Sequence, residues 1–203
     1  MRTRLPRAER EQQALGVAHR MFAERGFAAV TMDDVASAVG VTKPLLYTYF
    51  GNKDRLFLAC MEPAAEALVQ TVLAAVQRAE SPADALRLGV HAFFEFVDSD
   101  RDAWRVLFDD TLPASGDVAR RVLAHRERLT GLVAQTLLAR LPARAATEVE
   151  ALSTALLGAS EALARWWLQS GAISAADAAE LLISTVEPGL RARTSPRTTG
   201  DTQ

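Results

Sequence analysis

The 203-residue sequence predicts an all-α protein, and three observations support this prediction. Ala, Leu, Arg and Glu, which are favourable in helices, dominate the composition, whereas Ile, Tyr and Trp are scarce. Apolar residues recur at helical spacing along most of the chain. Helix-capping residues, Gly and Pro interrupt this pattern at intervals. We therefore expect about nine helices and no sheet.

The N-terminal part of the chain predicts three helices. The first ends at Gly26, which we expect to be its C′ residue. Thr31 and Asp34 form a capping-box-like start for the second helix. Thr42 is the expected cap of the third, where Pro44 lies in a first turn that needs no N–H. The expected helices cover residues 8–25, 32–39 and 43–50.

The rest of the chain predicts six longer or better-capped helices. Ser81 and Ser174 each begin a Ser-x-x-Asp capping box, and Pro63 is the expected kink of the fourth helix. The expected helices cover residues 53–79, 82–97, 101–108, 116–141, 143–170 and 175–190. The predicted domains are a helix-turn-helix domain over 1–53, a ligand-binding and dimerisation domain over 54–193, and a disordered tail over 194–203.

Charge is distributed unevenly along the chain. Residues 1–55 carry nine Lys or Arg and six Asp or Glu, a net charge of +3. The remaining residues carry fourteen and nineteen, a net charge of −5. Because the N-terminal part is basic and the rest of the chain is acidic, the sequence indicates a protein that presents its N-terminal end to phosphates.

Several classes of protein lack support in the sequence. No apolar N-terminal leader and no stretch of roughly 20 uncharged apolar residues is evident, so we expect a cytoplasmic protein without a membrane partner. The single cysteine, Cys60, is expected to be a buried apolar residue, with a redox sensor as the alternative. The three histidines, His19, His91 and His125, form no metal-ligand or catalytic pattern, so we expect no enzyme, no cofactor and no metal site.

The second and third helices form a helix-turn-helix candidate, because they are short and a glycine-containing turn joins them. Leu46 and Phe50 lie four residues apart and are expected to pack inward. The residues expected to point outward are Lys43, Pro44, Leu45, Tyr47, Thr48 and Tyr49. This outward set is unusually apolar for a surface in water, and bound DNA would cover it.

Residues 31–36 (TMDDVA) and 41–54 (VTKPLLYTYFGNKD) resemble the DNA-binding signature of the TetR (tetracycline-repressor) family. The resemblance covers about residues 8–61. It implies that Thr31 and Thr42, at helix N-termini, donate to DNA phosphates, and that Tyr47 and Tyr49 set their hydroxyls against the backbone. It also implies a phosphate contact for Lys53. The alternative is that the threonines are caps only and the tyrosines are half-buried aromatics.

The resemblance further assigns base contacts. Lys43 is expected to donate to a guanine, and Pro44 to touch a thymine methyl. Leu45 and Thr48 are secondary candidates. The carboxylates of Asp33 and Asp34 would either repel DNA at wrong positions or face away from the groove. Arg2, Arg4 and Arg7 form a basic arm that either follows the minor groove or is solvated.

A palindromic operator needs two recognition helices, so we expect a homodimer on double-stranded, pseudo-palindromic DNA. The last two helices offer small and aliphatic side chains for this contact, with intramolecular packing as the alternative. The predicted interface residues are Leu152, Leu156, Ala159, Leu163, Leu181 and Leu182.

A ligand pocket is expected among inward aromatic residues with polar neighbours, and plain core packing is the alternative for each. The candidates are His91, Phe94, Trp104, Phe108, His125, Arg128, Glu161, Trp166 and Trp167. Together they predict a small, mainly apolar or aromatic effector. Such an effector would tilt the fourth helix and change the separation of the recognition helices.

The sequence thus predicts a ligand-responsive, sequence-specific repressor that its effector releases from DNA. Two alternatives remain. One is a transcriptional activator of the same fold, and the other is a helical adaptor bundle that does not bind DNA.

Overall fold

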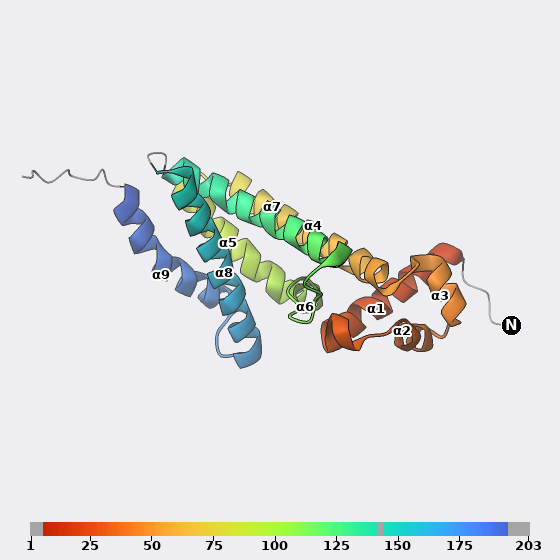
Figure 1. Cartoon of the computed structure of the whole chain (residues 1–203). Coiled ribbons are helices and arrows are strands. Elements are labelled where there is room, and N and C mark those ends of the chain that lie inside the picture. Colours follow the sequence, from red (N-terminus) through yellow and green to blue (C-terminus); the bar gives the residue numbers. More distant parts are fainter. Residues whose placement is uncertain (1–5, 142–143, 195–203) are drawn as a thin grey trace, which may run out of the picture. The chain divides into compact units, whose positions relative to one another are not determined.

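The computed structural model describes residues 6–141 and 144–194, and over these ranges it contains nine helices and no strand (Figure 1). The all-α prediction is therefore confirmed. The helices are α1 (Arg7–Ala29), α2 (Met32–Val39), α3 (Lys43–Phe50), α4 (Lys53–Gln77), α5 (Pro82–Ser99), α6 (Arg101–Leu107), α7 (Gly116–Arg140), α8 (Ala146–Ser170) and α9 (Ala175–Thr194).

The chain forms two compact units. The first contains residues 1–69 and 99–127, and the second contains residues 70–98 and 128–203. Three helices have residues in both units: α4, α7 and, by its last residue Ser99, α5. The chain therefore passes between the units three times, each time within a helix.

The core of the first unit is aromatic. Phe22 and Phe57 are almost completely buried, with ring centroids 5.2 Å apart in an edge-to-face arrangement. Phe27 contacts the Phe57 ring in the same way at 5.1 Å. Such edge-to-face pairs are favourable beyond the burial of apolar area. This cluster joins α1 to the first turns of α4, directly after the helix-turn-helix.

The regular course of α1 breaks at Gly26, which has a positive φ of 75° and a non-helical ψ of 163°. A side chain at this position would also meet the hydroxyl of Thr111 at 2.8 Å. The backbone N–H of Phe27 donates to Asp109, and that of Ala28 donates to the Thr111 hydroxyl at 3.1 Å. The loop after α6 thus caps the short segment that follows the break.

The second unit is held by packing between α8 and α9 and by aromatic contacts. The rings of Phe94 and Trp167 meet with centroids 6.0 Å apart, and the Trp167 indole donates to the carbonyl of Ile173. Arg140 and Glu187 form an ion pair at 2.6 Å, in which the Arg140 side chain is only 7% exposed. Hydrogen bonds from Arg140 lower the pKa of Glu187 below its usual range.

Most expected boundaries agree with the structure to within a few residues, and the exceptions lie in the C-terminal half. The helix expected from Ala143 begins at Ala146, and Pro142 and Ala143 lie outside the described residues. Thr194, expected to open a disordered tail, is the last residue of α9. The rest of that predicted tail, residues 195–203, also lies outside the described chain.

Cys60 is 5% exposed, and burial raises the pKa of its thiol to about 12. It is therefore a buried thiol and not a reactive thiolate at neutral pH. No group of metal-ligating side chains is found among the described residues. One helix, α4, has the length and composition of a membrane-crossing segment, although half of the relevant window is buried inside the protein, as in the core helix of a soluble protein.

Candidate nucleic-acid interface

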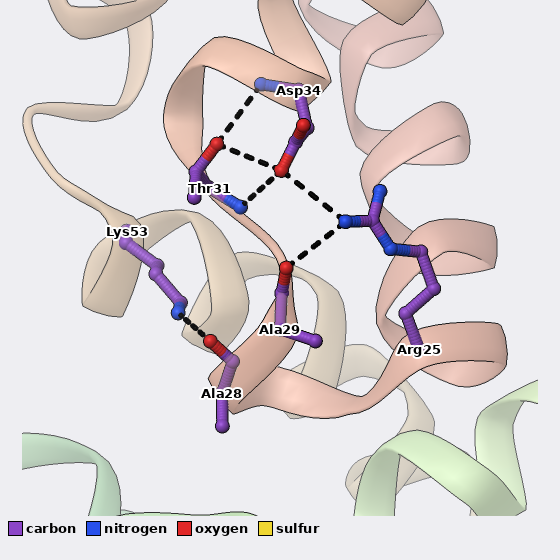
Figure 2. A network of polar contacts seen from close by, with 6 residues as sticks. All are labelled: Arg25, Ala28, Ala29, Thr31, Asp34 and Lys53. Atoms are coloured by element: carbon purple, nitrogen blue, oxygen red, sulfur yellow. Dashed lines mark hydrogen bonds and ion pairs between the residues drawn. The ribbon is translucent and has the colours of Figure 1, made fainter.

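The capping box predicted for α2 is present (Figure 2). The Thr31 hydroxyl accepts from the Asp34 N–H at 3.1 Å, and the Asp34 carboxylate accepts from the Thr31 N–H at 2.9 Å. The Thr31 hydroxyl also lies 2.8 Å from the same carboxylate, to which it donates. These hydrogen bonds lower the pKa of Asp34. Thr31 is thus engaged within the protein as a helix cap.

Arg25 extends this network toward α1. Its guanidinium contacts Asp34 at 3.4 Å and donates to the carbonyl of Ala29 at 3.0 Å (Figure 2). Both members of the Arg25 and Asp34 pair are partly exposed, so the pair contributes little stability by itself. Asp34 is thus engaged with Thr31 and Arg25 and not with the residues of α3.

The turn between α2 and α3 depends on Gly40, which adopts a left-handed conformation with φ 75° and ψ 35°. Its N–H and that of Val41 return to carbonyls at the end of α2. The chain then enters α3 at Thr42, which occupies the N-cap position but makes no side-chain capping bond. The exposed hydroxyl of Thr42 therefore has no capping role, in contrast to Thr31.

The two faces of α3 separate largely as predicted. Leu46 is completely buried, whereas the inward-predicted Phe50 is only half-buried. On the other side, Lys43, Pro44 and Thr48 are exposed, and the Tyr47 side chain is among the most exposed large apolar groups of the described chain at 41%. Leu45 and Tyr49, both predicted to face outward, are half-buried.

Lys43 forms an ion pair with Asp33 at 2.8 Å, which raises the pKa of the lysine. Both side chains are more than half exposed, so the pair is easily exchanged for another partner. Asp33 thereby holds the Lys43 ammonium beside the start of α3. A guanine could replace this carboxylate as the acceptor.

Two outward residues of α3 have partners within the protein. The Thr48 hydroxyl donates to the carbonyl of Pro44 at 2.8 Å, so a base contact would compete with this bond. The Tyr49 ring lies under the guanidinium of Arg7 at 5.5 Å. Arg7 also pairs with Glu11 and so lies along α1, while Arg2 and Arg4 lie outside the described residues.

Lys53, predicted to contact a phosphate, has partners within the protein. Its ammonium donates to the carbonyl of Ala28 at 3.3 Å (Figure 2). It also lies 4.3 Å from the centre of the Phe27 ring. Burial lowers the pKa of this lysine. The side chain thus ties the start of α4 to the end of α1, and a phosphate contact would require it to leave Ala28.

Sequence reasoning missed three residues that position this region. Asp109 and Thr111 cap the break in α1. Because they lie more than 80 residues away along the chain, no local sequence pattern predicts this contact. The third residue is Asn52, whose side chain accepts from the N–H of Arg55 at 2.9 Å and so caps α4. The preference of Asn for N-cap positions could have identified it.

The two threonines provide a matched test of this geometry. Thr31→Ala is expected to lower the free energy of unfolding by roughly 1 kcal/mol, because the cap of α2 is lost. Thr42→Ala is expected to leave it nearly unchanged, because Thr42 makes no capping bond. Urea unfolding followed by circular dichroism measures both values. Equal losses for the two variants would contradict the assignment of different roles.

The predicted ligand residues are divided between the two units. Most are engaged in packing or pairing: Phe94 contacts Trp167, Trp104 stacks on Phe108, and His91 lies 2.7 Å from Glu180. Glu161 is buried, Arg128 and Trp166 are exposed, and His125 is half-buried. Trp104, Phe108 and His125 belong to the first unit, whereas the others belong to the second.

Cavities lie elsewhere, within the second unit. The smaller is a partly open cavity of about 50 Å³, and the larger is a more open pocket of about 390 Å³. Their walls are mainly aliphatic and come from α4, α5, α7 and α8. None of the predicted ligand residues lines either cavity.

The predicted dimer residues divide between core and surface. Leu156 and Leu182 are buried within the chain, so intramolecular packing accounts for both. Leu152 and Leu163 are half-buried, and Ala159 is exposed. Leu181 on α9 is 50% exposed, and Trp166 on α8, which was predicted as a ligand residue, is 48% exposed. The exposed stripe of α8 consists of Ala151, Ala155, Gly158, Ala159, Ala162 and Trp166.

Comparison with known families agrees with this arrangement. Residues 14–60 match the model of bacterial regulatory proteins of the tetR family, and residues 82–187 match that of the tetracyclin repressor-like C-terminal domain. The HTH-type transcriptional activator FasR of Mycolicibacterium smegmatis is 34% identical over 167 residues, which are 82% of this chain and 76% of FasR.

Solved structures give the same result. A TetR-like transcriptional regulator from Rhodococcus sp. RHA1 is 36% identical, with a TM-score of 0.77, over 93% of this chain and 99% of that one. AibR, solved with isovaleryl coenzyme A and operator DNA, shares the fold with 20% identity and a TM-score of 0.72, over 87% of this chain and 97% of its own. The chain belongs to the TetR family of DNA-binding transcriptional regulators.

Proposed function

We propose that this regulator binds a pseudo-palindromic operator as a homodimer through the outward face of α3, and that a small apolar effector in its C-terminal helices controls this binding. The observation that carries the proposal is the exposed face of α3. Lys43, Pro44 and Tyr47 are exposed there, while Leu46 on the opposite face is fully buried. A cation, an imino ring and a phenol that share an outward surface suit contact with bases and phosphates.

The contacts of each side chain indicate whether it is assigned to phosphates, to base edges or to the margin of the DNA contact. Thr42 and Tyr47 are assigned to phosphates, because the first has no capping bond and the second is exposed. Lys43 and Pro44 are assigned to base edges at the start of α3. Leu45, Thr48 and Tyr49 are assigned to the margin of the contact. Residues 1–53 form the proposed DNA-binding domain.

Dimerisation is assigned to the exposed faces of α8 and α9. The stripe of Ala and Gly on α8 permits close approach of a second helix, and Trp166 and Leu181 add apolar area. Leu152, Ala159 and Leu163 border this surface, whereas Leu156 and Leu182 support it from inside. Residues 54–193 form the proposed effector-binding and dimerisation domain.

The effector is assigned to the aliphatic cavities of the second unit. Helix α4 supplies Val72 and Val76 to the smaller cavity, and only two residues separate its start from the end of α3. An effector that favours one position of α4 would therefore change how α3 is held. AibR, which has the same fold, was solved with both an acyl-coenzyme A and operator DNA.

Whether the regulator represses or activates depends on where the operator lies relative to a promoter. The predicted repressor and the alternative activator use the same DNA contact, and FasR, a relative over most of this chain, is named as an activator. A regulator that reads DNA and responds to a metabolite acts in the cytoplasm. The adaptor alternative gives no reason for the exposed Lys43, Pro44 and Tyr47.

Selection of bound duplexes from a random DNA pool, followed by titration of the enriched sequence, tests the proposal. The expected product is an inverted repeat that binds at roughly nanomolar Kd, with an affinity that falls steeply as salt rises. Lys43→Ala is expected to relax specificity at one base pair of each half-site and to cost about 1–3 kcal/mol on the enriched sequence. Arg105→Ala, an exposed change on α6, is the control and should bind as the wild type does.

Failure to enrich any sequence would contradict operator binding. If Lys43→Ala weakened all duplexes equally, DNA binding would stand but the assignment of Lys43 to a base would be wrong.

A further inference from the structure

We infer that the effector is a single-chain aliphatic amphiphile whose polar head donates hydrogen bonds, an alcohol or an ammonium rather than a carboxylate. This inference rests on the proposed effector site and names the class of molecule that fits it. The smaller cavity and the larger pocket share the lining residues Val76, Ala85, Leu132 and Thr136, so they adjoin each other, and we propose that they form the inner and outer parts of one site.

The inner part selects an aliphatic chain. Its lining is made almost entirely of Val, Leu and Ala, with Phe93 as the single aromatic ring, and no charged residue of the described chain borders it. The absence of a side chain at Gly89 keeps this space open, because a Cβ there would meet a methyl group of Val76 at 3.3 Å. A space that is slim, apolar and walled by branched side chains accommodates a flexible chain better than a fused ring system.

The two polar side chains of the inner part are free, as bonded in the structure, to accept hydrogen bonds from a ligand. The Ser160 hydroxyl donates to the carbonyl of Leu156 at 2.8 Å, and the Thr136 hydroxyl donates to that of Leu132 at 3.0 Å. Each hydroxyl hydrogen is thus already used, while lone pairs on each oxygen stay available. Both side chains are more than nine-tenths buried and line the inner part.

The outer part adds a negative charge. Among the residues that the structure describes, Glu80 is its one charged lining residue. The Ser81 oxygen accepts from the N–H of Asp84 to cap α5, so its hydroxyl hydrogen stays available as a donor. Gln135 is the lining side chain that offers an amide donor. A carboxylate or phosphate head would face the Glu80 carboxylate, whereas a hydroxyl or ammonium would find acceptors.

The direct test measures binding to the full-length protein without DNA. Decan-1-ol, decylamine and decanoate share one chain and differ in the head, and isothermal titration at pH 7 below their aggregation limits gives each affinity. We expect decanol and decylammonium to bind about tenfold more tightly than decanoate, since the carboxylate meets like charge and leaves acceptors unpaired. Equal or tighter binding of decanoate would overturn the inference.

Two pairs of variants locate the site. Ala85→Leu, at the junction of the two parts, should weaken all three probes at least about tenfold by filling the space. Ala83→Leu, an exposed position on the same helix, should change nothing. Glu80→Gln should weaken decylammonium alone, and Glu95→Gln, an exposed change on α5, should leave all probes unaffected.

Because Glu80 is exposed, its variant tests the inference even if Ala85→Leu fails to fold. Equal effects of the matched substitutions would overturn the site.

The proposed function and this inference can fail separately. Operator binding is measured without any amphiphile, and amphiphile binding is measured without DNA. If the operator binds but none of the three probes does, the inferred class of effector is wrong and the proposed DNA binding is unaffected. If the probes bind as expected and no operator is found, the proposed function is wrong and the inferred ligand site is unaffected.

Discussion

Leu181→Arg is expected to turn the regulator into a monomer and to lower its operator affinity by about 10²–10⁴-fold. Leu181 is half exposed on α9, and a charge at this position would be buried without a partner in the proposed dimer. When one half of a dimer is bound, its second recognition helix is held at a high effective concentration near the other half-site. Two separate chains lack this advantage. Sedimentation velocity measures the oligomeric state, and titration of the enriched duplex measures the affinity.

Leu123→Arg is the matched control, because Leu123 is 58% exposed on α7, outside the proposed dimer surface. This variant should sediment as the wild type does and bind DNA normally. A Leu181→Arg protein that remains dimeric would remove α9 from the interface. A Leu123→Arg protein that becomes monomeric would instead place α7 there.

Phe57→Ala is expected to lower the free energy of unfolding by about 3–5 kcal/mol, a large part of the total for a domain of this size. Its ring is completely buried between Phe22 and Phe27, which belong to α1 on either side of the break at Gly26. Removing the ring leaves a cavity at the base of the helix-turn-helix, so DNA affinity should fall as well. Urea unfolding gives the stability change.

Phe57→Leu keeps most of the buried volume and should lose much less stability than the alanine variant. Loss of less than about 1 kcal/mol in Phe57→Ala would contradict a central role for this aromatic cluster. An unchanged DNA affinity in a folded Phe57→Ala protein would show that the cluster does not position α3.

Local chemistry made much of the fold predictable. The capping bonds of Thr31 and Ser174 were expected from Thr-x-x-Asp and Ser-x-x-Asp, and both are present because such boxes are closed by residues three positions apart. The burial of Leu46 and the exposure of Tyr47 follow from the position of each residue on a short amphipathic helix. Helical periodicity therefore predicted most of the outward face of α3, although Leu45 and Tyr49 are half-buried.

Contacts between distant segments were not predictable in the same way. Periodicity tells which face of a helix is buried but not which neighbour covers it. Asp109 reaches Phe27 across 82 positions, and Lys53 turns to Ala28 because the break at Gly26 leaves that carbonyl within reach.

The residues of the proposed effector site were likewise not predictable from the sequence. Phe94, Trp104 and Phe108 were expected to line a pocket, but large rings fill space and pack against other rings. The cavities are left where smaller residues such as Gly89, Ala85 and Val76 meet.

A hydroxyl-radical footprint on the enriched duplex tests the central claim most directly, namely that two copies of α3 enter successive major grooves. Two protected stretches related by an inverted repeat, one helical turn of roughly 34–36 Å or a multiple of it apart, are expected for the wild-type protein. Protection of a single stretch, or uniform weak protection along the duplex, would contradict it.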